Sequence, residues 1–242
     1  MPAQAELALM GLVVALHLYD SALLLYCNEG VLSPRGKRGW AVGFGSDKLQ
    51  LRGRETYLPS PLHLHRPLYR LAWAFEGGAG GRRWSPEPRL FRVLAPLVWG
   101  MAVALFVLLP LGLFTRLGEP LLLAALLLMY GSLLCALLWL WGNRARLRIP
   151  ARQLAALSFE CLACAPFALN LVRHLSAKMP AEEDLESAAR RLQQPRDWQR
   201  TRAALIARLD DEIAGEEAGS ARLARLQAHR RSLAREGGDV AG

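Results

Sequence analysis

Two long stretches without a charged residue constrain this chain more than any other feature. Residues 93–115 and 120–143 are uncharged over 23 and 24 positions, whereas a helix needs about 20 apolar residues to cross the hydrocarbon core of a bilayer. Hydrophobic residues fill 52% of the 242 positions, which agrees with the membrane class of protein. The sequence therefore predicts an integral membrane protein with a transmembrane helical hairpin over residues 90–143.

Positive charge borders these stretches and predicts their orientation. The formal net charge is +9; residues 30–89 hold eleven Lys and Arg against four Asp and Glu, and residues 143–153 hold four Arg and no acid. Short loops rich in Lys and Arg stay on the cytoplasmic side of a membrane. Both basic segments are therefore predicted to be cytoplasmic, in a multi-pass protein of the inner (plasma) membrane.

A third apolar stretch lies near the N-terminus, in residues 5–28. No basic residue precedes it and no small-residue cleavage pattern follows it, so it fits a cleaved signal peptide poorly. We expect residues 1–29 to contain a retained first transmembrane helix that begins outside. The predicted fold class is thus an all-α polytopic membrane protein with three transmembrane helices.

Residues 144–175 form an arginine linker and an ambiguous fourth segment. Glu160, Pro166 and Asn170 interrupt the 19 otherwise apolar residues of 154–172. If this segment spans the bilayer, everything after it lies outside; if it is an interfacial helix, the C-terminus is cytoplasmic. Basic residues on both sides of the segment favour the interfacial helix.

The basic loop, residues 30–89, carries predictions of its own. Residues 40–44 and 49–57 predict a β-hairpin around a turn at 45–48, and residues 67–75 predict a short amphipathic helix. Cations then interleave with aromatic rings, a mixture that suits anionic headgroups at a membrane surface better than a protein partner or nucleic acid. This predicted membrane surface consists of Arg66, Tyr69, Arg70, Trp73, Arg82, Arg83 and Trp84.

Residues 176–242 read as a soluble helical tail with twelve basic and twelve acidic residues. Helices are predicted over residues 181–194, 196–214 and 220–235, and Ser220 is a candidate cap for the last of them. The last two helices should form an antiparallel hairpin whose narrow apolar stripes pack on each other or on a partner helix. The candidate partner-binding residues are Trp198, Leu205, Leu209, Ile213, Leu223, Leu226 and Leu233.

One polar face lies inside the predicted first span. His17, Asp20 and Cys27 recur at helical spacing, and Glu160 of the fourth segment is a further candidate for the same intramembrane polar site. An ionisable Asp within a membrane helix is costly and is a functional candidate by default. The alternatives are a buried hydrogen bond that fixes assembly, a contact with a membrane partner, and proton or ligand chemistry.

Cys161 and Cys164 have the spacing of a redox or metal-binding pair. The neighbouring Glu160 opposes formation of a thiolate, because like charges repel. A single pair of this kind predicts packing before chemistry. The sequence predicts no resident cofactor or metal and carries no catalytic signature, which leans against an enzyme.

These features predict a non-catalytic inner-membrane protein, an assembly, scaffold or recruitment subunit that binds its partner through the C-terminal helices. Its expected partners are an anionic lipid bilayer and either another protein or further copies of itself, with no nucleic acid. The alternative is a membrane-embedded redox, metal or cofactor-binding protein that uses His17, Asp20 and the cysteines. A homo-oligomeric channel lined by His17 and Asp20 is a third reading.

Overall fold

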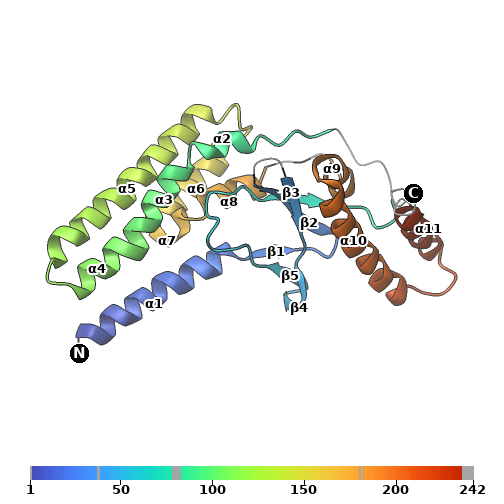
Figure 1. The fold of residues 1–242 in the computed structure, drawn as a ribbon, viewed down its shortest axis with the longest axis horizontal. Helices are drawn as coiled ribbons and strands as arrows, with labels where there is room; N and C mark the ends of the chain where they lie inside the picture. Colours follow the sequence, from blue (N-terminus) through green and yellow to red (C-terminus); the bar gives the residue numbers. More distant parts are fainter. Residues whose placement is uncertain (1, 37–38, 78–82, 180, 182, 236–242) are drawn as a thin grey trace. The chain divides into compact units, whose positions relative to one another are not determined.

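The computed structural model describes residues 2–36, 39–77, 83–179, 181 and 183–235 (Figure 1). The chain forms two compact units, each assembled from separate stretches of sequence. The helical unit comprises Met1–Leu23, Tyr57–Leu68 and Glu87–Met179, and the sheet unit comprises Leu24–Thr56, Tyr69–Pro86 and Pro180–Gly242.

Helices make up the regular structure of the helical unit. In chain order they are α1 (Pro2–Ser21), α2 (Pro88–Arg92), α3 (Ala95–Val103), the π-helix η1 (Ala104–Leu108), α4 (Leu109–Phe114), α5 (Gly118–Asn143), α6 (Ala151–Ala163), α7 (Ala165–Ala168) and α8 (Leu171–Ala177). α3 and α4 pack along α5 as a hairpin (Figure 1). Gly100 and Gly112 allow this close approach, since an added Cβ would lie 2.8 Å from Ser132 Oγ and 2.9 Å from Leu122 respectively.

Two helices are long and apolar enough to cross a membrane. They are Pro88–Phe114, of 27 residues, and Gly118–Asn143, of 26 residues, and they contain the two uncharged stretches of the sequence. Only 33% and 28% of their most apolar windows are buried, whereas the core helix of a soluble protein is mostly buried. The rest of the described chain therefore leaves most of each apolar window uncovered.

The prediction of an all-α protein with three transmembrane helices is wrong. Of the described residues, 61% are helical and 13% lie in strands of two small antiparallel sheets, and these residues contain two candidate spans. α1 is not one of them, because Glu6, His17 and Asp20 interrupt its apolar sequence. The helix also ends at Ser21, and the chain continues as a strand. The prediction that the N-terminus lies outside consequently loses its basis.

The fourth apolar segment is broken into short helices. α6 has 13 residues, about 20 Å at 1.5 Å per residue, which is shorter than a hydrocarbon core of about 30 Å. It stops at Cys164, whose backbone is extended with φ −134° and ψ 96°. Pro166 then lies in the first turn of α7, a position where its missing N–H costs nothing. No continuous helix over residues 154–172 can cross a bilayer.

The sheet unit contains two three-stranded sheets. One has the order β3-β2-β6, with β2 (Glu29–Arg35) paired antiparallel to both β3 (Gly39–Gly43) and β6 (Tyr69–Ala72). The other has the order β1-β5-β4, formed by β1 (Leu23–Leu25), β5 (Arg54–Tyr57) and β4 (Ser46–Leu51).

These strands correct both local predictions for the basic loop. β3 pairs with β2 rather than with the chain after it, and the hairpin joins β4 to β5 instead. Its turn falls at Arg52 and Gly53, whose positive φ values of 54° and 74° match the twist of a two-residue hairpin. The predicted helix over residues 67–75 is the strand β6, in which Tyr69 and Leu71 alternate into the core.

The C-terminal segment folds into three helices, as its sequence predicts. They are α9 (Leu185–Leu192), α10 (Pro195–Gly215) and α11 (Ala221–Arg235), and α10 and α11 pack as an antiparallel hairpin. The Ser220 hydroxyl accepts a hydrogen bond from the Leu223 N–H at 3.0 Å, which caps α11. Ion pairs from Arg230 to Asp210 and from Arg222 to Glu212 fix the register of the two helices.

Candidate functional site

A buried group of polar side chains joins α1 to α8 within the helical unit. Each helix contributes three residues at positions i, i+3 and i+4, so each set lies on one helix face. We call this group the α1–α8 cluster. Its members are His17, Asp20, Ser21, Asn170, Arg173 and His174.

Asn170 is the centre of the cluster and is fully buried. Its Nδ2 donates to Asp20 Oδ2 at 3.0 Å. Its Oδ1 accepts from Arg173 Nη1 at 3.0 Å and from Ser21 Oγ at 3.2 Å. The amide thus lies between a carboxylate and a guanidinium and gives each a hydrogen-bond partner, as buried charges require. Arg173 Nε is nevertheless buried without a hydrogen-bond partner among the described residues.

His174 binds the other side of Asp20. Its Nε2 lies 2.9 Å from both Oδ1 and Oδ2 of the carboxylate. A carboxylate only accepts, so Nε2 carries the proton of this hydrogen bond. Asp20 therefore receives hydrogen bonds from two residues of the same short segment, which fixes the end of α1 against α8.

Arg173 is a buried cation held by neutral acceptors. Its Nη2 donates to the Ser60 carbonyl at 2.6 Å, and its Nη1 also contacts Ser21 Oγ at 3.3 Å. Burial lowers the pKa of Arg173 to about 10, and the nearby Tyr57 and Asp20 act in the opposite direction. At neutral pH the guanidinium remains charged.

His17 is the neutral member of the cluster. Burial, followed by the positive charge of Arg173, lowers the pKa of His17 below its ordinary value. Its ring meets Phe106 edge-on, with the ring centroids 5.7 Å apart. His17 therefore contributes packing and an uncharged polar edge, while Asp20 and Arg173 carry the charge.

The cysteine pair does not have the properties of a redox or metal centre. Cys161 is fully buried, and its pKa is raised to about 12 by burial first and then by Asp20 and Glu160. A thiol attacks a disulfide or binds a metal as the thiolate, which this environment disfavours. The cysteines are free, and the described residues contain no group of three metal-ligating side chains placed to hold an ion.

The structure brings together only part of the predicted polar site. His17 and Asp20 meet, whereas Cys27 belongs to the sheet unit and Glu160 lies on the exposed side of α6. The hydrogen bonds of Asn170, Arg173 and His174 to α1 were not predicted. Their spacing repeats that of His17, Asp20 and Ser21, and this repeated i, i+3, i+4 pattern is the signal that would have paired the two faces.

The predicted cationic and aromatic membrane surface is not formed. Tyr69 and Trp73 are core residues, because pairing of β6 with β2 turns them inward. Tyr69 packs edge-on against Trp84 at 4.8 Å, and Arg70 forms an ion pair with Glu29. Arg66 is half-buried and Arg83 is exposed, while Arg82 lies outside the described residues.

Most of the predicted partner-binding residues are buried inside the sheet unit. Leu205, Leu209, Leu226 and Leu233 are fully buried. Trp198, Ile213 and Leu223 are half-buried. These side chains therefore hold α10 and α11 in the fold.

The α1–α8 cluster is best suited to positioning rather than catalysis. The groups around Asp20 and His174 are donors and acceptors already bound to each other, and Cys161, which lies within electrostatic range of Asp20, is held as a neutral thiol. A catalytic dyad would need a nucleophile within hydrogen-bond reach of the base.

Comparisons of the chain with protein-family models, curated proteins and solved structures found no match.

Proposed function

We propose that this chain is a non-catalytic protein of the inner (plasma) membrane that acts as an assembly, scaffold or recruitment subunit. The observation that carries the membrane part is the uncovered apolar face of α5. Leu127 and Leu138 are 64% and 72% exposed, although both lie within a 26-residue apolar helix. Lipid tails would cover this face without loss of the helical hairpin.

The proposed orientation rests on the charges at the ends of the hairpin. Arg89 and Arg92 lie in the first turns of Pro88–Phe114, and Arg144 follows Gly118–Asn143. At the other end of the hairpin, the turn holds Arg116, and Glu119 lies in the first turn of α5. Arginines favour the cytoplasmic side, so both ends of the hairpin are proposed to lie there. The proposal consequently places both chain termini in the cytoplasm.

An interfacial anchor supports the same orientation. Trp141 is partly exposed at the end of α5, and the Arg144 guanidinium lies 5.9 Å from the centre of its ring. Tryptophan rings favour the headgroup zone, and arginines next to it attract anionic lipids. The bilayer with anionic headgroups is therefore the first proposed partner.

The recruitment role is proposed for the sheet unit. Its apolar stripe is occupied internally, so the proposed contact uses exposed charges such as Arg200, whose side chain is 77% exposed. A second copy of the chain, packed through the uncovered faces of the two membrane helices, is the alternative partner.

Reversal of exposed charges on α10 in the full chain, Arg196→Glu with Arg200→Glu, should change the proteins recovered after cross-linking in membranes. An identical set of recovered proteins contradicts recruitment through this surface.

The membrane proposal is tested with two exposed leucines of similar accessibility. Leu127→Arg places a charge in the middle of the proposed lipid-facing surface, and Leu49→Arg places it on β4 of the sheet unit, where the leucine is 57% exposed. Arginine at the centre of a membrane helix costs about 2.5–3.5 kcal/mol on the insertion scale. The first variant should therefore become extractable from membranes by alkaline carbonate, and the second should remain with the wild type. Equal extraction of both variants contradicts the proposal.

A further inference from the structure

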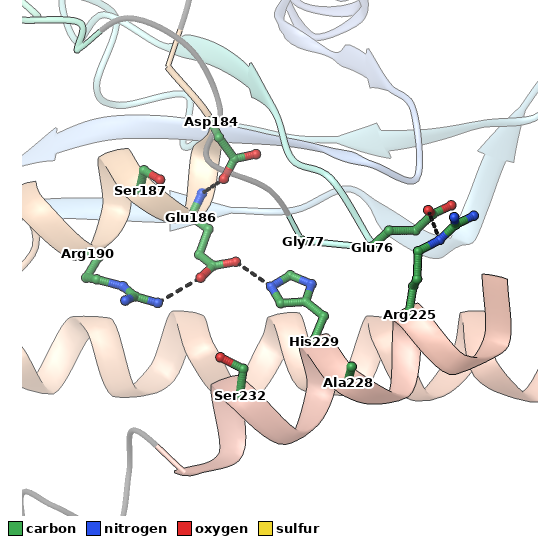
Figure 2. Close-up of a pocket in the computed structure, with 10 residues that line it drawn as sticks. All are labelled: Glu76, Gly77, Asp184, Glu186, Ser187, Arg190, Arg225, Ala228, His229 and Ser232. Atoms are coloured by element: carbon green, nitrogen blue, oxygen red, sulfur yellow. Dashed lines mark hydrogen bonds and ion pairs between the residues drawn. The ribbon is translucent and has the colours of Figure 1, made fainter. Parts of the chain in front are cut away.

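His229 of α11 is bound through both nitrogens of its ring. Its Nδ1 lies 2.8 Å from the Phe75 carbonyl oxygen. Its Nε2 lies 2.8 Å from Glu186 Oε2 of α9, a contact that Figure 2 shows. Both partners are acceptors. Neutral histidine donates from one nitrogen only, so this pair of contacts is complete only for the imidazolium. The side chain is 9% exposed, which leaves little water to replace a lost partner.

The charges around this ring come from three packed segments. α9 contributes Asp184, Glu186 and Arg190, the chain after β6 contributes Glu76, and α11 itself contributes Arg225. Glu186 also accepts from Arg190 at 2.8 Å, and Glu76 pairs with Arg225 at 2.6 Å and with Arg222 at 3.6 Å.

Asp184 is the remaining carboxylate of the group. It accepts hydrogen bonds from the backbone N–H groups of Glu186 and Ala74. Its negative charge raises the pKa of His229, so the surroundings of the ring favour the imidazolium.

The titration behaviour follows from these contacts. The hydrogen bond to Glu186 is the largest cause that raises the pKa of His229 above its ordinary 6.5, while burial acts against it. For Glu186, burial acts to raise the pKa. His229 and Arg190 outweigh this effect, so the pKa of Glu186 lies below its ordinary value. The stabilising contribution of His229 is complete below pH 6.5 and is lost as the pH rises through its raised pKa.

A cavity gives solvent access to this group. It has a volume of about 480 Å³ and is lined by the charged residues above together with Gly77, Ser187, Ala228 and Ser232. Water in the cavity can exchange the proton of His229 without unfolding the unit. His229 is also the only histidine in the sheet unit; the other four histidines of the chain belong to the helical unit.

We propose that His229 is a pH-sensitive latch: as an imidazolium it holds α11 against α9 and the chain after β6, and on losing its proton it releases that contact. The exposed ion pair between Arg230 and Asp210 joins α11 to α10 instead and has no group that titrates near neutral pH. Release therefore loosens one side of α11, the side that buries Leu226 and Leu233. The latch does not depend on the proposed membrane function.

Hydrogen exchange of the full chain in detergent micelles tests the latch. After correction for the intrinsic exchange rate, protection of residues 221–235 should fall between pH 6.5 and pH 9. The protection factor should fall by at most about tenfold for each pH unit by which the pKa of His229 lies above its ordinary value. His229→Gln should abolish the fall, and the control His63→Gln, in the helical unit, should retain it. Constant protection of the wild type, or an unchanged fall in His229→Gln, overturns the proposal.

A second variant keeps the test decisive where His229→Gln fails to fold. Glu186→Gln keeps a hydrogen-bonding group beside the ring and removes the negative charge that favours the imidazolium. The midpoint of His229 ring titration, followed by NMR of ¹⁵N-labelled histidine, should move to lower pH in this variant. A midpoint that stays in place or moves upward overturns the latch.

Discussion

Asp20 of α1 and His174 of α8 meet across 154 positions of sequence, with His174 Nε2 placed 2.9 Å from both carboxylate oxygens. Asn170 donates a hydrogen bond to the same carboxylate and accepts one from Arg173. A short polar segment thus holds the end of the first helix through a single carboxylate. This relationship gives the ionisable side chain near the end of α1 its hydrogen-bond partners.

Loss of the central amide should destabilise the helical unit. Asn170→Ala leaves Asp20 and Arg173 buried and short of a partner, which costs about 1–3 kcal/mol for each unsatisfied group. Thermal unfolding of the full chain in detergent micelles, followed by circular dichroism, should show a lower midpoint. Ser158→Ala is the matched control, because the Ser158 hydroxyl bonds only to the Leu154 carbonyl of its own helix. An equal effect of the two substitutions contradicts a central role for Asn170.

A double-mutant cycle should measure coupling between Asp20 and His174. Both side chains are largely buried, so the charged hydrogen bond between them should contribute about 1.5–3 kcal/mol. The cycle uses Asp20→Asn, His174→Gln and the double variant. The reference pair is Arg146 and Glu87 of the same unit, whose side chains are 65% and 59% exposed and for which about 0.2–1 kcal/mol is expected. A coupling energy no larger than that of the reference pair would show that the contact is incidental.

Arg208 should be essential to the stability of the sheet unit. It binds both Glu55 oxygens, at 3.0 and 2.6 Å, and also donates to the carbonyls of Cys27 and Gly45. Arg208→Met leaves the buried Glu55 carboxylate without its ion-pair partner. Removal of one partner of a buried ion pair lowers the free energy of unfolding by about 3–5 kcal/mol. The control Arg200→Met removes an exposed guanidinium of the same helix and should change stability little. Similar unfolding midpoints for the two variants contradict this assignment.

Thiol reactivity should separate Cys161 from Cys27. Cys161 is buried with a pKa of about 12, so almost no thiolate forms at pH 8, whereas Cys27 is exposed. Mass spectrometry after a short reaction of the folded chain with a maleimide in detergent should find the label on Cys27 and not on Cys161. Denaturation should make the two equally reactive, which serves as the control. Fast labelling of Cys161 in the folded chain would reopen the redox alternative.

The sequence predicts elements with a strong local signal and fails for those made by distant pairing. The two candidate spans and the helices α10 and α11 follow from charge-free length and from a 3.6-residue period. β2 contains Gly30 and Pro34 and has no clear alternation, so its role as the central strand appears only when β3 and β6 pair with it. β6 has four residues, too few to distinguish its period from that of a short helix.

The site was predictable to the same extent. His17 and Asp20 were evident, because polar residues inside an apolar helix are conspicuous. Asn170 and Arg173 were not, because they sit in a broken segment whose helices are set by Cys164 and Pro166 rather than by a regular pattern. Their spacing repeats that of His17, Asp20 and Ser21 and so indicates a second polar face, but the contact between the two faces depends on tertiary packing.

Cys135 offers the most direct test of the membrane assignment. Its side chain is exposed on α5, yet it lies near the middle of the proposed span, whereas Cys27 is exposed in the sheet unit. In inside-out membrane vesicles, a charged, membrane-impermeant maleimide should label Cys27 and leave Cys135 unmodified. Cys135 should react only after the bilayer is dissolved in denaturant. Labelling of Cys135 in intact vesicles at the rate of Cys27 would contradict the claim that this helix crosses a membrane.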